Sequence, residues 1–553
     1  MDKVILKYVL QNSIKYGKAN AGAIVGKILM EKPELKKNVK EVMKEINKII
    51  KETEKWNDNK KTEEVLKLDS KIFEKKKEKK KELPELENTK NLVMRFAPNP
   101  NGPLSLGRSK QALWNWFFVE KYNGEFILRF DDTDPKIKVP MKEAYGLIEE
   151  DLKFLKIKIS KKIIQSSRLK TYYKYAEELI KKNGAYVCTC EVEEYRKLRN
   201  SKLECPCRNF GIVEQEERWK QMFNEFKEGE AVYRVKTNVM DPNPAARDWP
   251  GFRIVDKSQH PLDKKSKVWP LLNFASAIDD HELKVTHILR GIDLQISDVR
   301  QKYLYAYFDW KYPETIYTGK LIFNDIKSTS KTRELIKQGK LDGWDDPRLL
   351  MIQSLKRRGF RKEALVNFIK ELGMNKNDVH VSFDNLAAYN KELIDKESNR
   401  YFLVLNPVKI KVEDAEEQKV ELNLHPDLRK GGRKFNVKDE FYIEEKDYEK
   451  LNENKLYRLM DCLNFKLEGK NVKFESNSFE DYKEKGERIM HWVPAKDSME
   501  IEIVMDDNTK RKGFGEKTLE KVKENEVIQA ERVGFLRLDK KLKNKLVFYY
   551  AHR

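Results

Sequence analysis

A proline- and glycine-rich segment, residues 95–107, constrains the fold of this 553-residue chain more than any other feature. It reads RFAPNPNGPLSLG and follows a short apolar run at 92–96, which predicts a buried strand. After it, residues 109–122 carry apolar side chains at helical spacing, and residues 126–130 predict a second strand. The segment is therefore a turn that leads from a strand into a helix inside a βαβ unit.

The position of this turn indicates a nucleotide site. Open α/β sheets bind nucleotides where a strand passes into a helix, because free backbone N–H groups and the helix dipole favour phosphate there. The turn is not a P-loop, since the Gly-x4-Gly-Lys-Ser/Thr pattern is absent from it.

The composition excludes a membrane protein and favours a polyanionic partner. Lys and Arg number 112 against 91 Asp and Glu, which gives a net charge of +21. A surplus of bases suits nucleic acid, and the alternative is a generally charged, solvated surface. No apolar run approaches the roughly 20 residues that span a bilayer, and the N-terminus lacks a secretory signal pattern. We expect a cytoplasmic protein.

Three regions of different character follow one another along the chain. Residues 1–58 have the apolar spacing of amphipathic helices, and residues 62–82 are a Lys-rich charge run that Pro84 closes. The α/β region begins near residue 91. From about residue 390, short apolar segments between turn residues predict β-barrel modules, with strands at 408–412, 499–504 and 534–538.

Four of the five cysteines form two close pairs. Cys188 and Cys190 are separated by one residue, as are Cys205 and Cys207, with fourteen residues between the pairs. Four thiolates at this spacing can surround one Zn²⁺ tetrahedrally and close a loop that has little core of its own. The alternatives are reduced structural thiols or disulfides, and a cytoplasmic location argues against disulfides.

The turn at 95–107 resembles the first signature of class I aminoacyl-tRNA synthetases, in the form that glutamyl and glutaminyl enzymes share. The archaeal-type version reads approximately Arg-Phe-Ala-Pro-x-Pro-x-Gly-Pro-Leu-His-Ile-Gly-His. Here Ser105 and Arg108 replace the two histidines, which in the family lie near the ATP phosphates. Ser can donate one hydrogen bond, and Arg carries a permanent charge that suits phosphate. The resemblance therefore implies ATP binding and leaves the rate of adenylation open.

Two further segments resemble the amino-acid site of the same family. Residues 126–135 read FILRFDDTDP, and the resemblance implies that Asp131 contacts the substrate's α-amino group. Arg290 stands where glutamyl enzymes carry an Arg, which suits a γ-carboxylate, and Arg95 is the second expected basic contact. Asp134 also matches the glutamyl branch rather than the glutaminyl one.

Residues 321–331 resemble the second signature, a mobile Lys/Ser-rich loop that closes over the triphosphate. Lys327 replaces a Leu of the archaeal-type pattern, and Lys331 keeps the final base. The resemblance implies catalytic roles for Ser105, Gly107, Arg108 and Lys331, with Mg²⁺ arriving on the nucleotide. The implied ATP-binding residues are Pro98, Gly102, Leu104, Ser105, Gly107, Arg108, Ser328, Thr329, Ser330 and Lys331.

The resemblance implies a multidomain α/β protein with a Rossmann-like catalytic domain. Its β-type C-terminal region indicates the archaeal branch, and the cysteine group falls where relatives carry a zinc clip. The expected divisions are a helical, Lys-rich extension and linker at 1–90, the first catalytic half at 91–187, an acceptor-stem-binding insertion at 188–267, the second catalytic half at 268–320, the signature loop and a helical connecting domain at 321–392, and a β-barrel anticodon-binding region at 393–553.

The activity implied by the resemblance is ATP-dependent ligation of L-glutamate to tRNA(Glu) through a glutamyl-adenylate, with release of AMP and diphosphate. A glutamine–tRNA ligase is one alternative, which Arg290 and Asp134 disfavour. A catalytically weakened tRNA-binding relative is another, which Ser105 and Arg108 favour. Whether tRNA(Gln) is also a substrate stays open, and the 1–90 extension is a candidate contact for tRNA or for a protein partner.

Overall fold

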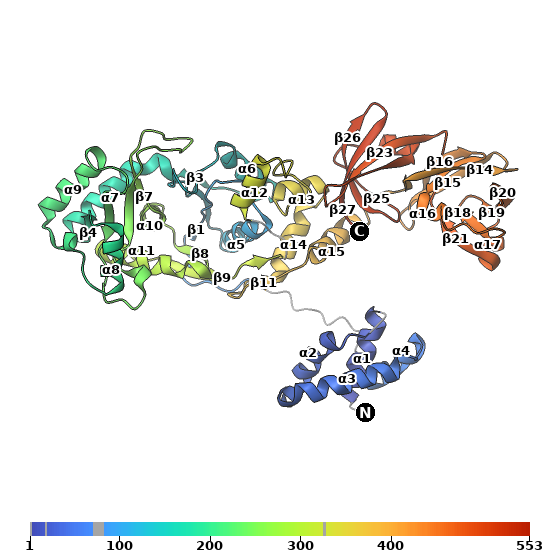
Figure 1. Ribbon diagram of the computed structural model, residues 1–553, viewed down its shortest axis with the longest axis horizontal. Coiled ribbons are helices and arrows are strands. Elements are labelled where there is room, and N and C mark those ends of the chain that lie inside the picture. The colour runs from blue at the N-terminus through green and yellow to red at the C-terminus, as the bar shows by residue number, and fades with distance from the viewer. Residues whose placement is uncertain (1–2, 17–18, 70–81, 324–327) are drawn as a thin grey trace. The chain divides into compact units, whose positions relative to one another are not determined.

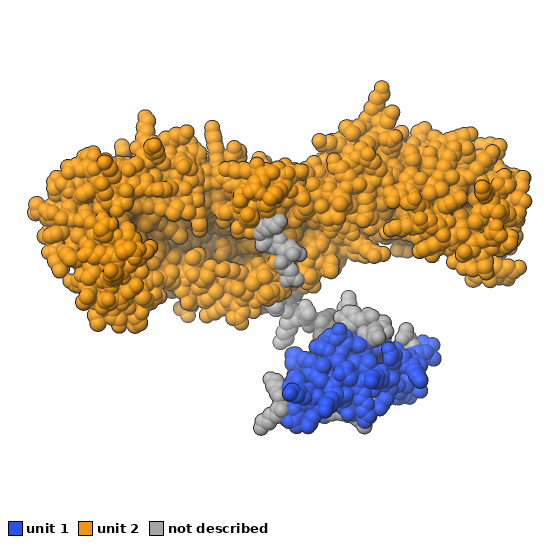
Figure 2. Space-filling view, in the orientation of Figure 1, with its two compact units in different colours: residues 1–80 blue, residues 81–553 orange. Residues whose placement is uncertain are grey.

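The computed structural model describes residues 3–16, 19–69, 82–323 and 328–553. The chain divides into two compact units, residues 1–80 and 81–553, coloured separately in Figure 2. Lys327 and residues 70–81 of the charge run lie outside the described residues. Within the described ranges, no helix has both the length and the apolar character needed to cross a membrane.

The N-terminal unit is helical, as predicted. Asn20 and Asn57 cap the N-termini of two helices by accepting backbone hydrogen bonds, as Asn commonly does. Apolar side chains at helical spacing form one buried cluster, which includes Ile5, Val9 and Ile46. The helices are α1 (Lys3–Tyr16), α2 (Ala21–Glu31), α3 (Val39–Thr53) and α4 (Asp58–Leu68).

A five-stranded parallel sheet forms the centre of the catalytic region (Figure 1). Its order is β3-β2-β1-β8-β9, so β1 lies between its sequence neighbour β2 and the much later β8. The order reverses at β1, and such a switch point leaves a crevice at the carboxyl ends of the strands. The elements are β1 (Val93–Phe96), α5 (Leu106–Tyr122), β2 (Glu125–Phe130), α6 (Lys142–Phe154), β3 (Lys161–Ile164), β8 (His287–Gly291) and β9 (Glu314–Thr318).

The inserted segment folds as a four-stranded antiparallel sheet whose outer strands lie just beyond the expected 188–267 range. The sheet and four neighbouring helices bury one aromatic-rich cluster, which explains why the strands continue past the insertion. Its strands are β4 (Ala185–Cys188), β5 (Val232–Val235), β6 (Pro250–Ile254) and β7 (Val268–Pro270). The helices are α7 (Leu169–Lys181), α8 (Val192–Asn200), α9 (Ile212–Asn224), α10 (Leu272–Glu282) and α11 (Gln295–Tyr307).

Short helices follow the catalytic sheet and lead to the C-terminal region. Phe368, Ile369 and Leu386 from them join the core that the parallel sheet and α5 form. Strands β10 (Leu321–Ile322) and β11 (Val379–His380) pair beside them. The helices are α12 (Thr329–Lys337), α13 (Ile352–Arg358), α14 (Lys362–Leu372) and α15 (Phe383–Ile394).

The C-terminal region is β-rich, as predicted, and is drawn in orange to red in Figure 1. It contains two seven-stranded sheets and a hairpin. The first sheet has the order β12 (Arg400–Tyr401), β25 (Val527–Ala530), β26 (Gly534–Leu542), β27 (Lys545–His552), β23 (Ser498–Val504), β24 (Lys510–Glu516) and β13 (Leu403–Leu405). The second has the order β21 (Gly486–Met490), β18 (Leu456–Leu459), β19 (Asn464–Glu468), β20 (Asn471–Ser476), β14 (Pro407–Glu413), β17 (Glu440–Glu444) and β22 (Val493–Pro494). The hairpin is β15 (Gln418–His425) and β16 (Arg429–Val437).

Candidate active site

A pocket opens at the carboxyl ends of β1 and β8, at the switch point of the parallel sheet. The three residues expected to contact the amino acid, Arg95, Asp131 and Arg290, all line it. They come from the end of β1, the loop after β2 and the end of β8. The other lining side chains include Gln111, Asn115, Leu272, Asn273, Ser276 and Gln301.

A buried ionic network holds two of these side chains from behind. Arg129 is fully buried, and its Nε and Nη1 donate to Asp131 and to Asp280, both at 2.7 Å. Arg95 Nε donates to the same Asp280 carboxylate at 3.0 Å. Burial raises the pKa of Asp131 even though Arg129 opposes it. Burial opposes ionisation of Asp280 too, but the charges of Arg95 and Arg129 outweigh it and lower the pKa of Asp280.

The guanidinium of Arg290 is also paired inside the protein. Its Nη1 contacts the carboxylate of Asp298, and its Nη2 donates to Gln301 Oε1 at 2.8 Å. Tyr312 and Tyr317 donate their hydroxyls to the same Asp298 carboxylate. A substrate carboxylate that approaches Arg290 therefore meets a cation that already has an anionic partner.

The first signature turn is anchored at both ends. Leu104 is fully buried, its N–H donates to Asp151 Oδ2 at 2.7 Å, and its carbonyl accepts from Ile352 at 2.9 Å. Ser105 is the N-cap of α5, where its Oγ accepts from the Arg108 N–H at 3.3 Å. The carbonyl of Pro98 accepts from the Asp131 N–H at 3.1 Å, which connects the turn to the pocket.

Arg108 is a largely buried cation with no carboxylate partner among the described residues. Its Nη1 donates to Asn101 Oδ1 at 3.1 Å and to the Asn99 carbonyl at 3.4 Å, and burial lowers its pKa. Gly107 and Arg108 belong to the first turn of α5, a 17-residue helix. A guanidinium beside a helix N-terminus is suited to phosphate oxygens.

The second signature begins another helix and touches the first. Ser328 caps α12 by accepting from the Lys331 N–H at 3.3 Å, and Ser328 and Ser330 are exposed. A Cβ on Gly102 would lie 2.7 Å from Thr329 Cγ2, so the turn and α12 are in close contact there. Lys331 Nζ forms an exposed ion pair with Glu334 at 2.8 Å.

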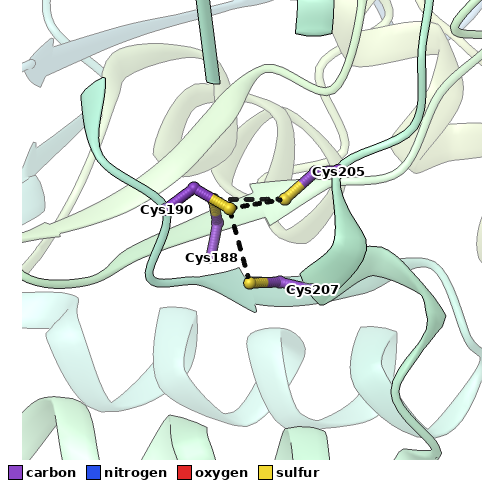
Figure 3. A group of neighbouring side chains, drawn as sticks. All are labelled: Cys188, Cys190, Cys205 and Cys207. Carbon is purple, nitrogen blue, oxygen red and sulfur yellow. Dashed lines mark hydrogen bonds between the residues drawn. The ribbon is translucent and has the colours of Figure 1, made fainter. Parts of the chain in front are cut away.

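The four predicted cysteine ligands converge in the insertion (Figure 3). Their sulfur atoms all lie within 4.8 Å of one another, and three pairs are separated by 3.4, 3.5 and 3.8 Å. Thiolates bound to one Zn²⁺ at about 2.3 Å lie roughly 3.8 Å apart at tetrahedral angles. The donor set and its spacing therefore fit a zinc ion.

Comparison with known proteins agrees with this geometry. Residues 91–396 match the family described as tRNA synthetases class I (E and Q), catalytic domain, and residues 398–485 and 489–539 match its anti-codon binding domains. The chain is 45% identical over 573 residues to the glutamate–tRNA ligase of Pyrococcus furiosus, with all of both chains covered. The chain belongs to the class I glutamate–tRNA ligases. The family resemblance, the α/β fold and the reaction drawn from the sequence are confirmed.

Two further relatives are similar to this synthetase to different degrees. The glutamate–tRNA ligase of Methanocaldococcus jannaschii is 43% identical over 564 residues, again with all of both chains covered. A solved glutamate tRNA ligase from Elizabethkingia meningosepticum is 22% identical, with a TM-score of 0.41, over 56% of this chain and 71% of that one.

Asp134 of this synthetase lies outside the amino-acid pocket. Its carboxylate accepts hydrogen bonds from the backbone N–H groups of Lys136, Ile137 and Lys138. It also pairs with Arg253 of β6 at 2.5 Å. Asp134 therefore ties the loop after β2 to the insertion.

Several residues that shape the site were missed from the sequence. Arg129 had a visible signal, since it is a charged residue within the apolar strand Glu125–Phe130. Asp280 also had one, because two adjacent acids interrupt the apolar face of α10. Asp298 and Asp151 had none, since each looks like an ordinary helical acid and only the fold brings it to the site.

Proposed function

We propose that the pocket binds L-glutamate and that the first signature turn binds ATP, so that the chain forms glutamyl-adenylate and then charges tRNA(Glu). An oxygen of the glutamate α-carboxylate attacks the α-phosphorus, and the bond to diphosphate breaks. A hydroxyl of the terminal ribose of tRNA then attacks the activated carbonyl, and AMP leaves. The observation that carries this proposal is the convergence of Arg95, Asp131 and Arg290 on one pocket beside the turn.

The pocket residues divide between the charged groups of the substrate. Asp131 pairs with the α-ammonium, and Arg290 pairs with the γ-carboxylate, with Arg95 as the second cation. Because Asp298 already holds Arg290, the γ-carboxylate shares that guanidinium with Asp298 or displaces it. A neutral amide offers Arg290 a weaker partner than a carboxylate does, so this arrangement favours glutamate over glutamine.

The nucleotide site is proposed to combine the N-termini of α5 and α12. Arg108, Ser105 and Gly107 contact the phosphates, while Pro98, Gly102 and Leu104 shape the turn. Residues Ser328 to Lys331, at the N-terminus of α12, supply a second set of groups for the leaving diphosphate, with Mg²⁺ bound to the nucleotide. Catalysis is then positioning and charge stabilisation without a covalent enzyme intermediate.

The direct test is ATP-dependent charging of transcribed glutamate and glutamine tRNAs, with labelled glutamate and glutamine supplied separately. We expect glutamate transfer to tRNA(Glu), and transfer to tRNA(Gln) as well would mean that tRNA selection is relaxed. Glutamine transfer would overturn the role of Arg290. Tight tRNA binding without any charging would mean that Ser105 and Arg108 have silenced the site.

We also propose that Cys188, Cys190, Cys205 and Cys207 hold a structural Zn²⁺. Four thiolates leave no open coordination position, so the ion would fix the insertion that contacts the acceptor stem. Cys205→Ser is expected to lower the zinc content and to weaken tRNA binding, whereas Cys462→Ser is the control because that buried cysteine lies outside the group. One zinc per chain in Cys205→Ser, measured by atomic absorption, would refute the site.

The N-terminal unit is proposed as an additional contact for tRNA or for a protein partner in the cytoplasm. Its four described helices enclose their own apolar cluster, so it can be removed as one piece. Deleting residues 1–80 should raise the KM for tRNA and leave the KM for ATP unchanged. An unchanged KM for tRNA would exclude the tRNA contact and leave a protein partner.

A further inference from the structure

Asp151 is a buried acid that connects three elements at the nucleotide turn. It lies on α6, and only 2% of its surface is exposed. Its Oδ2 accepts from the Leu104 N–H at 2.7 Å, and its Oδ1 accepts from Gln353 Nε2 at 2.8 Å. Leu104 immediately precedes the N-cap of α5, and Gln353 lies on α13. One carboxylate therefore joins α6, the signature turn and α13.

The same turn is held in register by backbone contacts. The Leu106 N–H donates to the Leu350 carbonyl at 2.9 Å, the Ile352 N–H donates to the Leu104 carbonyl at 2.9 Å, and Ser105 forms a bridge with Met351. The Leu104 N–H has Asp151 as its acceptor, and a buried N–H without an acceptor is strongly disfavoured. A change at Asp151 is therefore transmitted to the first turn of α5.

We propose that Asp151 is a positioning residue for the ATP site, and that its ionisation controls how firmly the first signature turn is held during adenylate formation. It does not touch the reacting atoms. The ionised carboxylate gives the Leu104 N–H and Gln353 two charge-assisted hydrogen bonds, whereas the protonated acid keeps only one good acceptor. This inference rests on the proposed function of the turn in binding ATP.

The surroundings put this proton exchange in the physiological range. Burial raises the pKa of Asp151 to about 7, and the negative charge of Glu150 adds to this rise. The hydrogen bonds from the Leu104 N–H and Gln353, and the positive charge of Lys356 on α13, oppose it. Activity and stability then respond to pH with opposite signs. The hydrogen bonds that hold the turn strengthen as pH rises through about 7, because the carboxylate ionises. The contribution of Asp151 to the free energy of unfolding changes in the other direction. It is fully present below about pH 4 and is lost as pH rises from there through about 7.

The experiment compares wild type with Asp151→Asn from pH 6 to pH 8.5. ATP–diphosphate exchange is measured with tRNA(Glu) present, and the Kd of ATP is measured by calorimetry. In wild type we expect the KM and Kd of ATP to rise about threefold to tenfold toward pH 6, as a charge-assisted hydrogen bond becomes a neutral one. Asp151→Asn keeps an acceptor for the Leu104 N–H without a charge, so both constants should stay near the wild-type value at pH 6. The control Glu143→Gln, at an exposed acid in the first turn of the same helix, should behave like wild type.

Gln353→Leu tests the same inference without altering the acid. It removes a donor that favours the ionised form, so the midpoint of the pH profile should move upward. A wild-type profile in Asp151→Asn, or an unmoved midpoint in Gln353→Leu, would overturn the proposal, and Gln353→Leu decides if Asp151→Asn does not fold. Absence of exchange in every protein at every pH would refute the proposed function instead, and the pH dependence of the ATP Kd would then decide the role of Asp151.

Discussion

The amino-acid pocket and the nucleotide turn lie at the same edge of the sheet, but they differ in whether their arginines have carboxylate partners. At the pocket, Arg95, Arg129 and Arg290 each have a carboxylate partner. At the turn, Arg108 has only an amide and a carbonyl oxygen as partners among the described residues. Paired cations fix geometry and let a substrate compete for them, which serves selectivity. An unpaired cation is available to any anion, which serves affinity for a triphosphate.

The largest effect is expected from Arg129→Met, which breaks the paired side of the comparison. Two carboxylates, Asp131 and Asp280, would lose a buried partner, and breaking a buried ion pair costs about 3–5 kcal/mol. The free energy of unfolding in urea should fall by about that amount, and adenylate formation should fall by about 100-fold or more.

Arg168→Met is the matched control for Arg129→Met. Arg168 donates to the neighbouring acid, Asp279, at 2.8 Å but does not line the pocket. The Arg168→Met variant should be less stable than wild type but keep the wild-type KM for glutamate. An equal rise of that KM in both variants would mean that general loosening, not the network behind the pocket, sets glutamate affinity.

Arg108→Ala tests the other side of the comparison, because it removes the unpaired guanidinium of the nucleotide turn. Loss of charge-assisted hydrogen bonds to phosphate is expected to raise the KM for ATP by about 10- to 100-fold. The melting temperature should not fall, because the guanidinium has no carboxylate to leave behind. Arg108→His restores the residue that the family signature carries and should recover most of the activity. A large loss of stability in Arg108→Ala would show that Arg108 is a structural residue.

Asp298→Asn sharpens the comparison by turning a paired cation into a nearly unpaired one. Arg290 would then offer its full charge to the γ-carboxylate, and the KM for glutamate should fall by about threefold. Asp293→Asn, which removes an exposed partner of Lys320 in the same stretch, is the control. If the KM for glutamate rises in Asp298→Asn, then Asp298 orients Arg290 rather than competing with the substrate.

The smallest effect is expected at the second signature, where Lys331 is paired but exposed. Glu334→Gln frees Lys331 from a surface ion pair, and such pairs contribute little. The KM for ATP should change by about twofold or less. A tenfold change would place Lys331 in the same class as Arg108.

Local patterns predicted the elements, and the family resemblance pointed to Arg95, Asp131 and Arg290, three of the residues that line the pocket. The spacing of apolar residues gave the strand, turn and helix around residues 92–130, because each lies within one continuous stretch of sequence. The carboxylates that pair with the arginines were not found, since Asp280 and Asp298 reach Arg95 and Arg290 only through tertiary packing. Asp134 shows the converse, because a residue typical of the glutamyl branch lies outside the pocket.

The ion pair between Asp134 and Arg253 limits how the enzyme can be recombined with its relatives. The two residues belong to segments that could be exchanged as cassettes, the loop after β2 and the inserted sheet. A chimera that takes its insertion from a relative without a basic residue at the place of Arg253 would leave Asp134 unmatched, three residues from Asp131. Such chimeras should stay active when the loop after β2 and the insertion come from the same relative, so the two segments should be exchanged together.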